Sequence, residues 1–341
     1  MIRARAEDWL LRHWYGTHRP PWYLRMLEPI YRLGFQRIQK NALDGAADIQ
    51  SVLPLIVVGN ITAGGSGKTP LVIRLCQLAL EMHLMPGIAS TGYGRKSRDT
   101  LLVEAGGDAD TFGDEPILLA TRTGVPVMVA ARRLDAVNQL TGLNLDLIVS
   151  DDGLQQAGMT GDIEICVVDG ARGLGNQHLL PAEPLREPAT RLRQVDYVIT
   201  NGAWHGKPDD LDVSVMQLEA ITVRSLDQKV EYTVESFRQK FSGKIIHAIA
   251  GIGNPQRFFR MLQTLGIETQ PHAFPDHHVF SGTDFDSLMK GSMIIMTEKD
   301  AVKCRSLGLE NAWYVPVETR LPVDFESRFK TQLEKIIRGG K

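Results

Sequence analysis

The sequence predicts an α/β fold: a parallel sheet with helices on both faces, followed by a smaller C-terminal α/β domain. Short, continuous Val/Ile/Leu runs alternate with helix-patterned stretches, as expected for strands buried on both faces of a sheet. A chain of 341 residues also suits about two domains, each able to bury its own core. We therefore expect three parts, formed by residues 1–45, 46–222 and 223–341.

The first part, residues 1–45, is expected to be helical and is rich in basic and aromatic side chains. Basic residues outnumber acidic ones, and Trp9, Trp14 and Trp22 are three of the five tryptophans. Basic residues with interfacial aromatics are typical of a helix that lies on an anionic membrane surface. A helix packed on its own domain with a solvated basic face is the alternative, and composition alone does not separate the two.

The second part opens with a glycine-rich loop between a strand and a helix. Leu55–Val58 is followed by Thr62-Ala63-Gly64-Gly65-Ser66-Gly67-Lys68-Thr69 and then by the helix-patterned Leu71–Met82. Glycines let successive backbone N–H groups surround phosphate oxygens, and the helix start adds partial positive charge. Lys68 can reach the β- and γ-phosphates, and Thr69 can place its hydroxyl on Mg²⁺. The pattern predicts a P-loop NTPase-like sheet, although Thr62 replaces a usual glycine; an ordinary glycine-rich turn is the alternative.

Further apolar runs predict the other strands of this sheet: Gly87–Ser90, Pro126–Ala130, Leu145–Ser150, Ile163–Asp169 and Val195–Thr200. Active sites of parallel sheets lie at the carboxyl ends of the strands. Asp151 and Asp152 stand at such an end, in the manner of a Walker B segment, where adjacent carboxylates can hold a Mg²⁺ water. A turn with a helix cap is the alternative for this Asp-Asp-Gly sequence.

Two other charged clusters fall in this part. Asp114 and Glu115 precede Pro116, which suits the first turn of a helix. In a kinase, an aspartate here can accept the proton of an attacking hydroxyl, whereas helix capping alone would also explain Asp114. Arg186 and Glu187 lie on a proline-bounded loop, where Arg186 can bind a phosphate with two hydrogen bonds, or where both are solvated charges.

The third part follows an extended stretch of alternating polar and apolar residues, Val213–Val223. Its expected strands and helices are Ile245–Ala250, Pro255–Leu265, Met293–Thr297, Asp300–Leu307, Trp313–Val317 and Phe325–Ile337. Its most distinctive polar feature is Asp276-His277-His278, which fits a metal site, a catalytic partner or surface histidines. Zinc is disfavoured, because no cysteine or further histidine has supporting spacing.

Composition excludes some classes of protein. Lys and Arg number 38 against 40 Asp and Glu, and a net charge of −2 argues against a general nucleic-acid binder. The sequence has neither an apolar run long enough to span a bilayer nor the pattern of a signal peptide. Cys76, Cys166 and Cys304 are widely spaced and odd in number, which fits buried free thiols in a reducing cytoplasm.

Together these segments resemble the tetraacyldisaccharide 4′-kinase family, the lipid A kinases of Gram-negative bacteria. The match runs in the family's order over most of the chain and comprises 58–70, 92–95, 113–116, 151–155, 180–188, 274–278 and 297–303. The family's own loop carries the same departure as Thr62. The resemblance implies an enzyme that uses ATP and Mg²⁺ to phosphorylate the 4′-hydroxyl of tetraacyldisaccharide 1-phosphate, forming lipid IVA.

The resemblance also implies location and partners. The enzyme would be peripheral on the cytoplasmic face of the bacterial inner membrane, with a membrane-embedded glycolipid as acceptor. An acceptor with four acyl chains does not leave the bilayer readily, which favours the membrane-surface interpretation of residues 1–45. The resemblance implies neither a protein partner nor nucleic acid.

By similarity, Asp114 would be the catalytic base, assisted by His277. Lys68, the loop residues 62–69 and Arg186 would hold phosphates, and Thr69, Glu115, Asp151 and Asp152 would handle Mg²⁺. Three residues depart from the family pattern: Thr91 stands where arginine is usual, Gln156 where histidine is frequent, and Glu183 where glycine is common. These departures concern substrate fine structure and rate, because the base, the lysine and the metal ligands are intact.

Two other classes of protein remain open. A nucleotide-switch ATPase often carries a lysine where this chain has Ala63, and a GTPase would want an Asn-Lys-x-Asp motif that residues 297–300 only approximate. A kinase of a soluble small molecule would leave the tryptophan-rich segment without a role.

Overall fold

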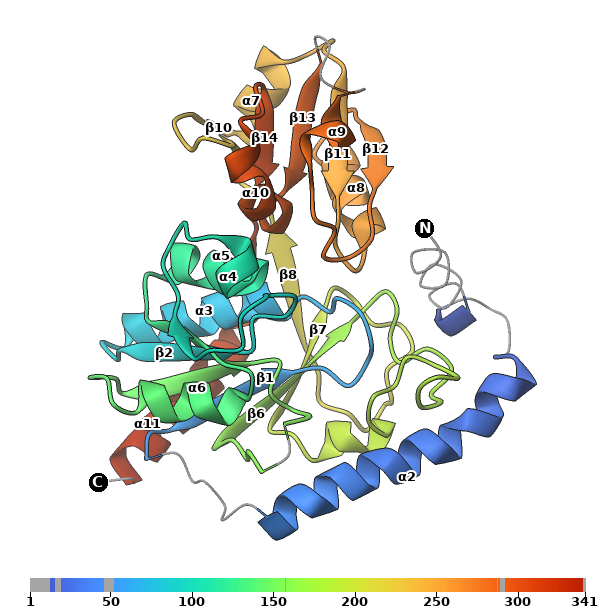
Figure 1. The fold of residues 1–341 in the computed structure, drawn as a ribbon, viewed down its shortest axis with the longest axis vertical. Coiled ribbons are helices and arrows are strands. Elements are labelled where there is room, and N and C mark those ends of the chain that lie inside the picture. Colours follow the sequence, from blue (N-terminus) through green and yellow to red (C-terminus); the bar gives the residue numbers. More distant parts are fainter. Residues whose placement is uncertain are drawn as a thin grey trace.

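Two mainly parallel sheets organise the chain, which the computed structural model describes over residues 13–15, 20–45, 52–156, 158–286, 288 and 292–339 (Figure 1). Within these residues the larger sheet has nine strands in the order β15-β8-β7-β6-β1-β5-β2-β4-β3. The smaller sheet has six, in the order β10-β9-β14-β13-β11-β12. We call the nine-stranded sheet with its helices the larger body, and the six-stranded sheet with its helices the smaller body.

The strands of the larger sheet are β1 (Leu55–Gly59), β2 (Pro86–Ser90), β3 (Leu101–Leu102), β4 (Val127–Val129), β5 (Leu147–Asp151), β6 (Ile163–Asp169), β7 (Tyr197–Asn201), β8 (Ser214–Glu219) and β15 (Glu318–Arg320). Its helices are α3 (Lys68–Glu81), α4 (Ala109–Phe112), α5 (Asp114–Thr123), α6 (Arg133–Leu140) and α11 (Val323–Gly339). Side chains of β1 alternate between two cores, with Ile56 on the side of α3, α5 and α11 and Val57 on the side of α6. Helices therefore cover both faces, and the predicted fold class is confirmed.

The smaller body repeats this construction. Its strands are β9 (Thr222–Ser225), β10 (Glu231–Thr233), β11 (Ile246–Ala250), β12 (Gln270–Ala273), β13 (Met293–Thr297) and β14 (Ala312–Val315), and its helices are α7 (Val234–Lys240), α8 (Pro255–Thr264), α9 (Gly282–Phe285) and α10 (Glu298–Cys304). Phe237 and Phe258 pack on one face of the sheet, and Phe285 packs on the other.

The chain crosses between the bodies twice, whereas the predicted division at residue 223 has a single crossing. The stretch expected as an extended connector supplies β8 to the larger sheet and β9 to the smaller one. After β14 the chain returns, so that β15 pairs with β8 and α11 packs against α3. The return follows from the apolar stripe of α11, because Phe325, Phe329 and Leu333 complete the core of the larger body.

Helix α2 (Trp22–Gly45) lies along the side of the larger body (Figure 1). Tyr31 Oη donates to the Arg186 carbonyl at 3.1 Å, and Glu28 Oε1 accepts from Leu179 N at 3.2 Å. The rest of the basic, tryptophan-rich stretch, residues 1–12 and 16–19, lies outside the described residues. No helix in the described part of the chain is both long enough and apolar enough to cross a membrane.

The three cysteines are free and buried, as predicted. Burial raises the pKa of the Cys166 and Cys304 thiols to about 12, and it raises the pKa of Cys76 as well.

Candidate active site

The glycine-rich loop after β1 presents backbone amides at the start of α3. Gly64 and Gly67 adopt positive φ angles of 103° and 94°, a region that side chains other than glycine rarely occupy. Among the described residues, no side chain caps the helix at Gly67, so the N–H groups of its first turn are open to an anion. A Cβ atom on Gly67 would also lie 2.3 Å from Asn201 Nδ2, so any other residue there would displace the Asn201 side chain.

Neighbouring segments hold the start of this loop. Thr62 forms an antiparallel bridge with Leu185, and Ala63 N donates to the Pro184 carbonyl at 2.7 Å. Tyr15 Oη also donates to the Ala63 carbonyl at 2.9 Å. The loop is therefore supported from outside at the position where a glycine is usually found.

Lys68 and the paired aspartates meet at the carboxyl ends of β1 and β5. Lys68 Nζ lies 3.2 Å from Asp152 Oδ1, and Arg186 Nη1 lies 3.5 Å from Asp152 Oδ2. Burial alone would raise the pKa of Asp152, but Lys68, Arg186 and Arg133 together lower it to about 2. Asp151 is only 3% exposed; burial, followed by repulsion from Glu115, raises its pKa. The two neighbours thus have opposite tendencies to hold a proton.

Asp114 faces His277 across the interface between the two bodies. Asp114 lies in the first turn of α5, and its Oδ2 atom is 3.4 Å from His277 Nδ1. Burial opposes ionisation of Asp114, but His277 and then Lys299 outweigh it and lower the pKa to about 2. His277 has a φ of 57°, and its ring packs against that of Tyr93, with the centroids 4.7 Å apart and the planes tilted by 52°. His278 also lines the larger cavity of this site, and its Nε2 atom lies 3.3 Å from Asp284 Oδ2.

Lys299, at the start of α10, is a site residue that the sequence reasoning missed. Its Nζ atom lies 3.0 Å from Glu115 Oε1 and 3.4 Å from Asp276 Oδ1. The available signal was its place just after the strand Met293–Thr297, where a parallel sheet presents its functional groups.

Two cavities meet at this site. One of about 530 Å³ runs from Gly65–Thr69 to Asn201, Phe258 and Met261. The other, of about 850 Å³, is lined by Asp151, Asp152, Arg186 and His277 and by further polar side chains that include Tyr93 and Arg133. Both cavities border Lys68, Glu115 and Asp276, so these residues lie between two potential ligands.

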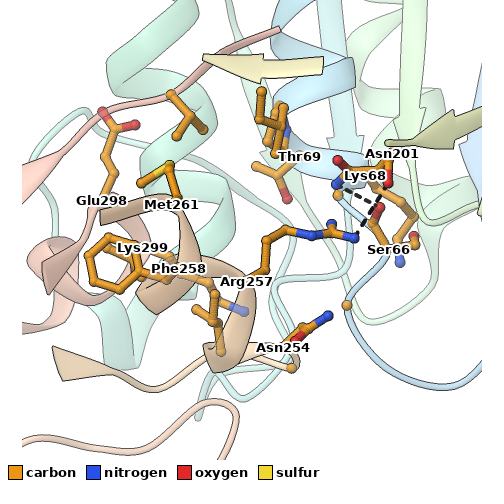
Figure 2. Close-up of a pocket in the computed structure, with 18 of the residues that line it drawn as sticks. Ser66, Lys68, Thr69, Asn201, Asn254, Arg257, Phe258, Met261, Glu298 and Lys299 are labelled. Atoms are coloured by element: carbon orange, nitrogen blue, oxygen red, sulfur yellow. Dashed lines mark hydrogen bonds between the residues drawn. The ribbon is translucent and has the colours of Figure 1, made fainter. Parts of the chain in front are cut away.

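The smaller body closes one side of the first cavity, as Figure 2 shows. Asn201 Nδ2 donates to the Ser66 carbonyl at 3.2 Å, which links the end of β7 to the loop. Arg257 of α8 reaches across to the larger body, where its Nη2 lies 2.5 Å from Asp169 Oδ1. Phe258 and Met261 provide an apolar wall next to these polar groups.

The predicted metal ligands offer an oxygen-rich but incomplete set. Asp151 Oδ1 is buried and has no hydrogen-bond partner among the described residues, as expected for an atom that awaits a cation. The described residues contain no group of three or more His, Cys, Asp or Glu side chains placed to hold a metal by themselves. Mg²⁺ usually combines one or two carboxylates with phosphate oxygens and waters, so these residues fit Mg²⁺ bound together with a nucleotide.

Glu187 lies behind the site. Its Oε1 accepts from Gln155 Nε2 at 2.5 Å, and its Oε2 is 3.6 Å from Arg191 Nε.

Of the three departures from the family pattern, Glu183 is fully buried and accepts from Asn176 Nδ2 at 2.8 Å. Thr91 borders the larger cavity, and Gln156 borders neither cavity.

Comparisons with known proteins agree on one family. The model of the family described as tetraacyldisaccharide-1-P 4′-kinase matches residues 20–338. A tetraacyldisaccharide 4′-kinase of Pseudomonas putida is 41% identical over 334 residues, covering 97% of this chain and 98% of the relative. The enzyme of the same name from Shewanella denitrificans is 40% identical over 335 residues, with 97% of this chain and 98% of the relative covered.

A solved structure has the same fold. The crystal structure of LpxK from Aquifex aeolicus in complex with ATP superposes with a TM-score of 0.73 at 27% sequence identity. The superposition covers 92% of this chain and 99% of that chain.

Proposed function

Because this chain belongs to the tetraacyldisaccharide-1-P 4′-kinase family, we propose which of its residues perform the family's reaction. The protein is an ATP-dependent phosphotransferase of lipid A synthesis that acts on the 4′-hydroxyl of a tetraacyldisaccharide 1-phosphate. One observation supports our assignment of roles: Lys68 and Glu115 border both cavities, which gives ATP and the acceptor a common boundary.

The smaller cavity is the site we propose for ATP. Backbone amides of residues 64–68 surround the β- and γ-phosphates, and Lys68 Nζ adds positive charge. Arg186 adds further positive charge from the side of the larger cavity, which it lines. The nucleoside lies toward Asn201, Phe258 and Met261, where polar and apolar groups occur together.

The larger cavity is the site we propose for the acceptor sugar. Asp114 takes the proton of the 4′-hydroxyl, whose oxygen forms a bond to the γ-phosphorus while the bond to the bridging β,γ-oxygen breaks, leaving ADP. His277 Nδ1–H orients the Asp114 carboxylate from the smaller body. Contact between the two bodies excludes water, which would otherwise compete for the phosphoryl group.

Mg²⁺ is held, in this proposal, by Thr69, Glu115, Asp151 and Asp152 together with phosphate oxygens. When bound, it neutralises charge on the phosphate oxygens during transfer. Lys68, which contacts Asp152 through its ammonium group, keeps that carboxylate oriented beside the loop.

Transfer of labelled γ-phosphate from ATP to tetraacyldisaccharide 1-phosphate in detergent micelles with Mg²⁺ tests these roles. We expect Asp114→Ala to lower kcat by about 100-fold or more, the range of a general base, while ATP still binds. We expect Lys68→Ala to lose transfer, and Lys96→Ala, which alters an exposed lysine, to retain it. Wild-type turnover by Asp114→Ala contradicts the base assignment, and ATP hydrolysis without labelled lipid favours a nucleotide switch.

We also propose that α2 lies on the anionic, cytoplasmic face of the inner membrane. Trp22, Met26, Ile30 and Leu33 recur at helical spacing on one face, and all are at least 65% exposed. Tyr31 and Glu28, on the opposite side of the helix, contact the larger body. The exposed arginines Arg25 and Arg32 lie between these faces, as expected for a helix in the interface of anionic lipid.

A further inference from the structure

We propose that Lys299 is a positioning residue for phosphoryl transfer, whose ammonium group holds Asp114 and His277 in one arrangement across the interface between the bodies. The inference rests on the proposed role of Asp114 as the base. It adds to that role the group that brings the base and its partner together.

The contacts of Lys299 carry the inference. Besides Glu115 and Asp276, its Nζ atom lies 3.4 Å from His277 Nε2 and 3.9 Å from Asp114 Oδ2. Two of these four groups belong to the larger body and two to the smaller one. Among the described residues, no other lysine or arginine lies within 4 Å of the carboxylates of Asp114, Glu115 or Asp276.

Lys299 also determines how His277 faces Asp114. A lysine ammonium group has only hydrogens to donate, so His277 Nε2 acts as an acceptor in this arrangement. The proton of a neutral ring then resides on Nδ1, the atom that faces Asp114 Oδ2. Lys299 thereby selects the form of His277 that can donate to the base.

The backbone that carries Lys299 is fixed by buried groups. Thr297 Oγ1 accepts from Asp300 N at 3.1 Å, and the fully buried Asp300 accepts from Gly251 N at 2.9 Å. These hydrogen bonds fix the backbone at the start of α10. A side chain that aligns four partners needs such a rigid backbone.

Arg122 provides a matched comparison. It also bridges the bodies, with Nη1 2.6 Å from Glu298 Oε2 and Nη2 2.6 Å from Glu318 Oε1. Glu298 is the immediate neighbour of Lys299, yet Arg122 lies in the last turn of α5 whereas Asp114 and Glu115 lie in the first. Loss of Arg122 removes an ionic bridge between the bodies without removing a partner of Asp114.

The test compares steady-state transfer by Lys299→Met, Arg122→Met and Asp114→Asn in full-length protein, with circular dichroism melting as the check on folding. We expect Lys299→Met to lower kcat by about 100-fold, with its KM for ATP within about threefold of the wild-type value. We expect Arg122→Met to keep kcat within about threefold of the wild-type value. Equal losses of kcat in both variants, or a change in KM alone, overturn the inference. If Lys299→Met does not fold, Lys299→Gln, which keeps a donor without the charge, takes its place.

A double variant separates this inference from the proposed function. If Lys299 acts through the base, Lys299→Met costs less than about threefold when added to Asp114→Asn, because residues that act as a unit are not additive. A full, additive loss overturns the positioning role and leaves the base assignment standing. Wild-type turnover by Asp114→Asn alone overturns the base assignment instead.

Discussion

Asp114 keeps a low pKa although its carboxylate is almost entirely buried. Desolvation favours the neutral acid, and the contacts with His277 and Lys299 more than reverse that preference. The carboxylate is thus ionised throughout the neutral pH range, which a proton acceptor requires. The same contacts link the stability of the protein to pH.

We predict that the difference in free energy of unfolding between the wild type and Asp114→Asn becomes smaller as the pH falls. A pKa lowered from 3.8 to about 2 contributes stability above pH 4, and that contribution disappears as the pH falls through the folded-state value. The full contribution is about 2 kcal/mol, and roughly half of it is gone at pH 3. Urea unfolding of both proteins at pH 7, 5 and 3 measures the difference.

The matched control for this prediction is Asn144→Ala, because Asn144 lies on the surface between α6 and β5 and has no titratable group. Its difference from wild type should vary less with pH. A difference for Asp114→Asn that stays constant or widens toward pH 3 contradicts the predicted sign.

At the scale of elements, the sequence pattern is most informative for strands whose two faces are both buried. Buried Val/Ile runs gave β1, β5 and β6 within two residues of the expected bounds, because both faces of those strands are apolar. Helix α3 begins at Lys68 rather than at the expected Leu71, since the loop itself supplies its first turn. The edge strand β3 spans only two residues, too few for a periodic pattern to predict it.

Some residues of the candidate site can likewise be identified from a local sequence pattern, and others cannot. The glycine-rich loop and the paired aspartates each follow a single strand, so their chemistry can be recognised in a local pattern. Lys299 also follows a single strand, but that place does not define its role, because its partners Asp114 and Glu115 lie 184 residues or more away and on another body. The return of α11 to the larger body was likewise outside the reach of periodicity, which identifies an apolar stripe but not its partner.

We predict that Ile30→Glu combined with Leu33→Glu weakens sedimentation of the protein with anionic liposomes. Both side chains lie on the exposed stripe of α2, where a charge opposes insertion into the interface and repels anionic lipid. Val323→Glu is the control, because it alters an equally exposed apolar residue at the start of α11. Unchanged sedimentation of the α2 variant returns this helix to a purely structural role.

At the scale of the whole molecule, the two bodies meet through charged contacts that surround the proposed reaction centre. Lys299 contacts carboxylates on one side of the smaller cavity, and Arg257 contacts Asp169 on the other. Asp169 is 3% exposed and also accepts from Asn254 Nδ2 at 3.1 Å. Ion pairs therefore join the smaller body to the larger one, and a buried charge among them, such as Asp169, would be unfavourable without its partner.

We predict that Arg257→Met lowers the free energy of unfolding by about 3 kcal/mol, because it leaves the Asp169 carboxylate buried without its cation. Adding Asp169→Asn removes that charge, so the double variant should recover part of the loss. Denaturant unfolding of the wild type, both single variants and the double variant measures this coupling. A double variant whose loss equals the sum of the single losses contradicts it.

The burial of all three cysteines has a practical consequence for measuring the relation between α2 and the two bodies. Thiols alkylate through the thiolate, and a pKa near 12 leaves almost none of it at neutral pH. A fluorescent maleimide should therefore leave the native chain unmodified. One cysteine introduced on the exposed face of α2, and a second on α8, would then be the only sites that take up dyes. Energy transfer between these dyes would report how the helix and the smaller body move when ATP and lipid bind, with every native cysteine left in place.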